Sequence, residues 1–159
     1  MPFVFMYGPD SLQGRIYDRL GPSDVMGGAM IEGYVLTFDK PPMSGTHGLA
    51  NLKKTPGESA FGVLYDLTRK QIETLGGYYG GYSVDDITVS LLPLPEGAEM
   101  EPELLARRPK GPVKAQVFIA RRTKAGLAPE PAALTATLQG ATENGAPEAF
   151  TQKLGALKS

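Results

Sequence analysis

The segment Phe3-Val4-Phe5-Met6-Tyr7-Gly8-Pro9-Asp10-Ser11-Leu12 contains the change of backbone structure on which the fold depends. Its first five residues are aromatic, β-branched or long apolar residues, which favour a β-strand. The next four, Gly8 to Ser11, are typical of a tight turn. Apolar residues then recur at helical spacing from Leu12 to Leu20, and either Asp10 or Ser11 is expected to cap the helix. A strand, a tight loop and a helix in this order direct free backbone N–H groups toward an anion.

Outside this segment, glycines and prolines divide the chain into short apolar runs. The 20 glycines and 14 prolines fall between these runs, which is typical of a strand-rich domain with many tight connections. Further strands are expected at 34–38, 48–52, 60–67, 82–92 and 113–120, and helices at 68–75, 131–138 and 147–157. Thr55-Pro56-Gly57-Glu58 is expected to form a hairpin turn. These elements predict one α+β domain over residues 1–159 with a mainly antiparallel or mixed sheet.

Two further stretches carry distinct local signals. Thr68 and Gln71 have the spacing of a capping box, so a helix is expected to begin there. Residues 93–112 are rich in proline and acidic residues and are expected to form a surface excursion with a helical turn near Leu104. Seven of the 16 basic residues then lie between Arg107 and Lys124. This basic run is either a patch for an acidic ligand or RNA, or a solvated edge strand facing an acidic loop, and we favour the second interpretation.

The composition excludes several classes of chemistry. The chain has no cysteine and one histidine, which excludes thiol nucleophiles, cysteine-based metal sites and multi-histidine metal sites. Its 16 basic and 17 acidic residues give a net charge of −1, which provides no general attraction to nucleic acid or to an anionic membrane. No apolar run approaches the ~20 residues of a membrane span, and residues 1–8 are typical of a strand rather than a signal peptide. We therefore expect a cytoplasmic protein without nucleic-acid or membrane partners.

Proton transfer in such a chain falls first to Asp, Glu, Tyr or Lys. His47 is expected in a surface loop between Thr46 and Gly48 rather than at a catalytic site. Asp85 and Asp86 could supply a carboxylate, but their place at the start of a strand is more typical of solvated residues.

Four segments, in this order along the chain, resemble the γ-glutamylcyclotransferase family, which includes the AIG2-like proteins. They are 5–12 (Phe-Met-Tyr-Gly-Pro-Asp-Ser-Leu), 48–65 with its Gly-Leu-Ala-Asn-Leu and Phe-Gly-Val-Leu-Tyr runs, 75–82, and 140–147 (Gly-Ala-Thr-Glu-Asn-Gly-Ala-Pro). The resemblance spans almost the whole chain and is weakest over 93–112. It implies a small closed β-barrel, mixed or antiparallel, flanked by short helices, with a cavity formed by the first loop.

The resemblance also implies a chemistry. In the family, the α-amine of a γ-glutamyl compound attacks its own γ-carbonyl, releasing 5-oxoproline and an amine or amino acid. A glutamate takes the proton from the attacking amine and delivers it to the leaving nitrogen. Backbone N–H groups of a Tyr-Gly-Ser-x-Leu loop hold the substrate and face the oxyanion. No metal or other cofactor takes part, and the expected partner is a small amide or γ-glutamyl ligand, bound by a monomer or a homodimer.

This sequence departs from the family where the chemistry resides. The family's Leu-Asp-x-Phe-Glu-Gly pattern is matched by Leu75-Gly76-Gly77-Tyr78-Tyr79-Gly80, so Tyr79 takes the glutamate's position. A phenol has a reference pKa near ~10 against ~4.3 for Glu and is a poor base at neutral pH. Pro9 replaces the loop serine and has no N–H to donate. Asp10 adds a carboxylate where an anion should bind, so either the ligand is cationic or neutral there or Asp10 turns outward as a helix cap.

Two hypotheses follow from the resemblance. In the first, the protein is a divergent enzyme of transferase or lyase type that acts on a γ-glutamyl or related aminoacyl amide, with Tyr79 as its catalytic residue. In the second, it is a non-catalytic pseudoenzyme that binds such a ligand. The glutamate-dependent mechanism is not expected in either case. Tyr82 keeps a family tyrosine, whereas Phe118 keeps a ring but lacks its hydroxyl; the expected ligand-binding residues are Tyr7, Gly8, Pro9, Asp10, Ser11, Leu12, Tyr82 and Phe118.

Overall fold

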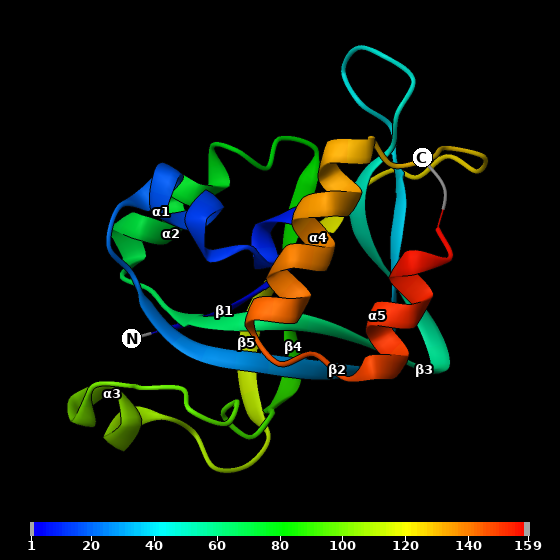
Figure 1. Ribbon diagram of the computed structural model, residues 1–159. Helices are drawn as coiled ribbons and strands as arrows, with labels where there is room; N and C mark the ends of the chain where they lie inside the picture. Colours follow the sequence, from blue (N-terminus) through cyan, green and yellow to red (C-terminus); the bar gives the residue numbers. More distant parts are fainter. Residues whose placement is uncertain (1, 158–159) are drawn as a thin grey trace.

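A computed structural model describes residues 2–157, in which five strands form a closed barrel (Figure 1). The strands are β1 (Phe3–Tyr7), β2 (Asp24–Lys40), β3 (Leu49–Asp66), β4 (Tyr82–Leu91) and β5 (Val113–Ala120). Their order around the barrel is β1-β3-β2-β4-β5. All neighbouring pairs are antiparallel except β1 and β5, which pair in parallel and close the barrel. The expected α+β fold with a closed mixed barrel is confirmed.

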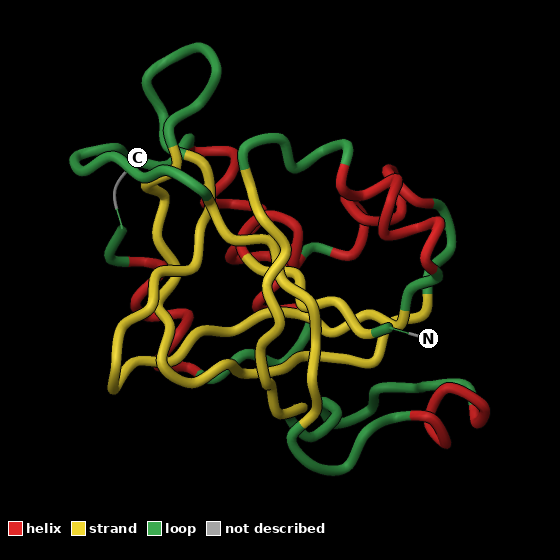
Figure 2. Tube along the Cα trace, turned by 180° about the vertical axis from the view of Figure 1, so that it is seen from behind, coloured by secondary structure: helices red, strands yellow, loops and turns green. Residues whose placement is uncertain are grey.

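Short helices lie outside the barrel (Figure 2). A 3₁₀ turn, η1 (Gly8–Ser11), leads directly into α1 (Gln13–Leu20). The remaining helices are α2 (Arg69–Gly76), α3 (Pro102–Arg107), α4 (Pro131–Glu143) and α5 (Glu148–Gly155). The expected helices at 68–75 and 147–157 and the turn near Leu104 are therefore present, whereas α4 runs past its expected end at Leu138. None of the helices in residues 2–157 is long and apolar enough to cross a membrane.

β1 lies in the core between β3 and β5. Val4 and Phe5 are fully buried and Met6 is 1% exposed. Burying side chains of this size contributes about 1.5–3 kcal/mol each, so the apolar run of β1 is a main source of the barrel's stability. The chain leaves β1 at Tyr7, and the site described below forms at that end.

β2 and β3 are longer than the sequence indicates and form one antiparallel ribbon of 17 and 18 residues. The expected hairpin turn at 55–58 is wrong. Lys54 pairs with Tyr34 and Ser59 with Glu32, so 55–58 bulges out of β3 opposite Gly33 and the same two strands resume pairing beyond it. Extra residues in one strand of a pair are accommodated by such bulges. Proline and glycine occur both in hairpin turns and in bulges of this kind, which is why the sequence suggested a hairpin.

The surface excursion at 93–112 stands apart from the barrel and carries α3 (Figure 1). Two arginines attach it. Arg107 binds Asp24 at 2.8 Å and Asp66 at 2.9 Å, and Arg108 Nε donates to the Met26 carbonyl at 2.9 Å. Two residues of the basic run are therefore used to hold the excursion, so that run is not a continuous free patch.

The loop η1 is supported from behind by α4. A Cβ added at Gly140 would lie 2.3 Å from Ser11 Oγ and 2.6 Å from the Leu12 backbone nitrogen. Asn144, at the end of α4, donates from Nδ2 to the Ser11 carbonyl at 3.3 Å and accepts from Gln13 Nε2 at 2.7 Å. The 140–147 motif therefore positions the first loop, which explains why both segments contribute to the same resemblance.

We expect Gly140→Ala to destabilise the protein by about 1–3 kcal/mol, because the new methyl group would overlap with the loop backbone. Urea unfolding would measure this change. Gly14→Ala is the matched control, since no atom lies within 4 Å of a Cβ at this helical glycine. Equal stability of the two variants would show that α4 does not fix the loop.

Candidate functional site

The loop between β1 and α1 is tightly wound at Gly8. Gly8 has a φ of +64°, and a Cβ there would lie 2.8 Å from the Ala50 Cβ. Ser11 Oγ donates to the Gly8 carbonyl at 2.7 Å and so closes the turn. The expected capping of α1 by Asp10 or Ser11 is wrong: the residue preceding the helix is Leu12, and no side chain caps it. Both polar side chains make other contacts within the site.

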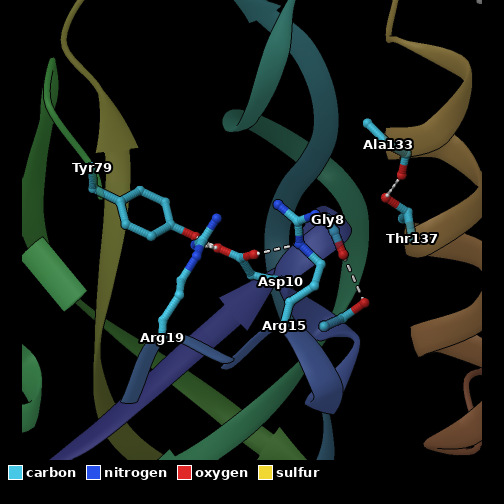
Figure 3. Close-up of polar contacts among 8 residues, drawn as sticks. Gly8, Asp10, Arg15, Arg19, Tyr79, Ala133 and Thr137 are labelled. Carbon is cyan, nitrogen blue, oxygen red and sulfur yellow. Dashed lines mark hydrogen bonds and ion pairs between the residues drawn. The ribbon is translucent and has the colours of Figure 1, made fainter. Parts of the chain in front are cut away.

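Asp10 is buried at the centre of this loop, with 4% of its surface exposed. Its Oδ1 accepts from Arg15 Nε at 3.0 Å and its Oδ2 from Arg19 Nη1 at 2.5 Å. The Tyr79 hydroxyl also donates to Oδ2. Figure 3 shows the three side chains converging on the carboxylate. The alternative in which Asp10 turns outward is therefore excluded, and two cations from α1 compensate its charge.

Tyr79 is positioned by the turn that joins α2 to β4. Its ring stacks on Phe118 of β5, with ring centroids 4.3 Å apart and planes at 13°. The Tyr82 ring packs against it in a T-shaped arrangement, with ring centroids 5.0 Å apart and planes at 77°. Burial, followed by the negative charge of Asp10 and the hydrogen bond to it, raises the pKa of Tyr79 well above 10. The phenol keeps its proton at neutral pH and acts as a hydrogen-bond donor.

Two more tyrosines link strands of the barrel next to the loop, Tyr7 joining β1 to β5 and Tyr82 joining β4 to β3. The Tyr7 hydroxyl donates to the Phe118 carbonyl at 2.5 Å, and the Tyr82 hydroxyl donates to the Ala50 carbonyl at 2.6 Å. Burial raises the pKa of both phenols, and the charge of Asp10 adds to the effect. Neither group is a proton acceptor near pH 7.

These side chains surround a small cavity of about 150 Å³. It is lined by Tyr7, Pro9, Asp10, Arg15, Arg19, Leu49, Ala50, Tyr78, Tyr79, Gly80 and Tyr82. Five of the residues predicted from the sequence thus meet at one cavity. Gly8, Ser11, Leu12 and Phe118 do not line it, although Ser11 closes the turn at Gly8 and Phe118 stacks on Tyr79. His47, Asp85 and Asp86 are exposed and do not line it.

The sequence analysis did not identify the arginines of this site. Arg15 and Arg19 are four residues apart and therefore share one face of α1. Arg19 also lies over the Tyr78 ring, 4.7 Å from its centroid. The sequence signal that could have identified them is a pair of arginines at helical spacing that follows Asp10, the acidic residue of the first loop. Among the described residues that line the cavity, Asp10 is the one carboxylate.

The raised pKa of Tyr79 predicts a specific pH dependence of stability. The folded protein binds the phenol proton more tightly than the unfolded chain does. The associated stability is therefore fully present below the unfolded pKa of ~10 and is lost as the pH rises beyond it. Tyr79→Phe should weaken the decline in unfolding free energy above pH 10, by up to about 1.4 kcal/mol per pH unit.

Urea unfolding at a series of pH values from 8 to 11 would measure this decline. Tyr17→Phe is the control for loss of an exposed phenol, since Tyr17 is 61% exposed and outside the cavity. Identical slopes for the wild type and Tyr79→Phe would contradict the assignment.

Comparison with solved structures identifies the fold. A structure described as "Gamma-glutamyl cyclotransferase" matches with a TM-score of 0.79 and 22% identity, over 99% of this chain and 88% of that one. An uncharacterized human protein matches with a TM-score of 0.80 and 22% identity, over 98% and 87%. An AIG2-like protein from mouse matches with a TM-score of 0.54 and 19% identity, over 79% and 80%.

No protein-family model matches the sequence, and comparison with curated proteins found no relative. The structural matches confirm, at the level of the fold, the resemblance carried by the four segments. The chain has the fold of the γ-glutamyl cyclotransferase and AIG2-like proteins.

Proposed function

We propose that this chain is a γ-glutamylcyclotransferase-like protein that binds a γ-glutamyl or related aminoacyl amide beside Asp10 and Tyr79, without running the glutamate-dependent reaction. The fold and the cavity at the first loop support the ligand class. One observation is the main argument against that reaction. Asp10 is the one carboxylate among the described lining residues, and it already accepts hydrogen bonds from two guanidinium groups and a phenol.

Intramolecular acyl transfer needs a group that accepts a proton from the attacking amine and returns it to the leaving nitrogen. Tyr79 holds its proton, and the adjacent negative charge of Asp10 makes a phenolate there still less favourable. Both carboxylate oxygens of Asp10 are in turn engaged by Arg15 and Arg19. The geometry therefore favours hydrogen bonding to a bound ligand over proton transfer.

A second candidate function is catalysis through Tyr79 itself. It is supported by the position of Tyr79, which lines the cavity and carries a proton that it can donate. In this reaction Tyr79 would protonate the leaving nitrogen and recover a proton from the nitrogen that attacked. The cost of the transient phenolate next to Asp10 makes this reaction slow.

A panel of γ-glutamyl amides tests the proposal through two measurements on the same samples, thermal unfolding and release of 5-oxoproline. At about ten times Kd, binding should stabilise the protein by about 1.4 kcal/mol and raise Tm by several degrees. We expect stabilisation by at least one compound, with no 5-oxoproline above the buffer blank. Tyr79→Glu should also be inactive, because its carboxylate would meet that of Asp10.

Product release that disappears in Tyr79→Phe would support the second candidate and overturn binding without turnover. Release retained in Tyr79→Phe would contradict both roles given to Tyr79. The absence of stabilisation across the whole panel would overturn the proposed ligand class.

A further inference from the structure

Arg15 and Arg19 have more hydrogen-bonding capacity than Asp10 uses. A guanidinium group carries five N–H donors, and each arginine makes one hydrogen bond to Asp10. Within residues 2–157, neither arginine donates to a second protein acceptor. Their side chains are 41% and 20% exposed, whereas that of Asp10 is 6% exposed. Both arginines therefore keep donors that no described acceptor uses, and both line the same cavity.

The cavity is electropositive. Its charged lining residues are Asp10, Arg15 and Arg19, so a single negative charge faces two positive charges. In a partly desolvated site, an unbalanced guanidinium attracts an anion more strongly than it does at an open surface. Arg19 is also held in place by the Tyr78 ring on which it lies, which reduces the entropy lost when it binds a further group.

The loop itself provides one donor fewer than a loop without proline. Pro9 lines the cavity and has no backbone N–H. An anionic group entering here must therefore find a replacement donor, and the guanidinium groups of α1 are the cationic donors of the lining. Guanidinium groups bind carboxylates with two parallel hydrogen bonds, which adds both strength and orientation.

The size of the cavity limits what can enter. Its volume of about 150 Å³ corresponds to about five water molecules at ~30 Å³ each. This accommodates a carboxylate with a few attached atoms. Leu49 and Tyr78 are 44% and 54% exposed, so the rest of a larger ligand can extend over them toward solvent.

We infer that the ligand carries a carboxylate that binds to the free donors of Arg15 and Arg19, with Tyr79 and Asp10 beside it. This inference rests on the proposed function for its choice of site, and it adds the charge and the anchoring group of the ligand. Asp10 then has a defined role: it orients the two guanidinium groups and reduces their combined charge to a level suited to one monoanion.

The test compares 5-oxoproline with 5-oxoprolinamide, which differ in having a carboxylate or a neutral amide. Isothermal calorimetry at low and high salt would measure both affinities for the wild type and for three variants. Arg15→Gln removes one donor group. The double variant Asp10→Asn/Arg19→Gln removes the donors of Arg19. Because Asp10 is neutralised as well, it leaves no unpaired buried charge. Arg122→Gln is the control, since Arg122 is exposed and outside the cavity.

The wild type and Arg122→Gln should prefer the acid by about tenfold or more, as expected for charge-assisted hydrogen bonds, and the preference should fall at high salt. Arg15→Gln and the double variant should each lose most of it while remaining folded by circular dichroism. Equal binding of acid and amide by the wild type, no binding of either compound, or a preference retained in both arginine variants would overturn the inference.

These outcomes are separate from those of the γ-glutamyl panel. If γ-glutamyl amides stabilise the protein equally in the wild type and in both arginine variants, the proposed function stands and the carboxylate anchor fails. If the acid preference depends on the arginines but no γ-glutamyl amide binds, the anchor stands and the ligand class fails.

Discussion

The buried charge of Asp10 is the interaction on which the organisation of this site depends. A carboxylate with 4% exposure loses its hydration and must be compensated by hydrogen bonds and opposite charge. Its partners come from two other parts of the fold. Arg15 and Arg19 belong to α1, and Tyr79 belongs to the turn before β4. The hydrogen bonds and ion pairs of this one carboxylate therefore join the first loop, α1 and the 75–82 segment.

The barrel determines where this cluster forms. β1 ends at Tyr7, whose hydroxyl is bound to the Phe118 carbonyl of β5. α4 approaches the loop so closely at Gly140 that no side chain fits between them. Packing thus fixes the loop from behind, while the ion pairs fix its polar face. The same scaffold could hold a carboxylate at position 79, but Asp10 now occupies the neighbouring space and Tyr79 serves as its donor.

Much of the fold could be predicted from local sequence. The capping box of Thr68 and Gln71 forms as expected, and β5 has the predicted limits of Val113 and Ala120. These features depend on residues close together in the chain. The bulge at 55–58 could not be distinguished from a hairpin turn, because the difference depends on β2 continuing to pair on both sides of it.

The site was predictable in part. The family resemblance brought Tyr7, Asp10, Tyr79 and Tyr82 together, since the order and spacing of its segments imply the barrel that the structure shows. The pairing of Asp10 with Arg15 and Arg19 was not predicted, because such contacts depend on side-chain directions at the start of α1. When Arg15 and Arg19 are left out of account, the Asp10 carboxylate is expected to repel anions. With them, the same loop becomes an electropositive cavity.

A double-mutant cycle of Asp10→Asn and Tyr79→Phe tests this account most directly. Urea unfolding at pH 7 would give the free energy of unfolding of the wild type, both single variants and the double variant. Because the phenol donates to a buried charge, we predict that the two substitutions are coupled by about 1–3 kcal/mol. Additivity within about 0.5 kcal/mol would contradict the claim that Asp10 and Tyr79 act as one unit.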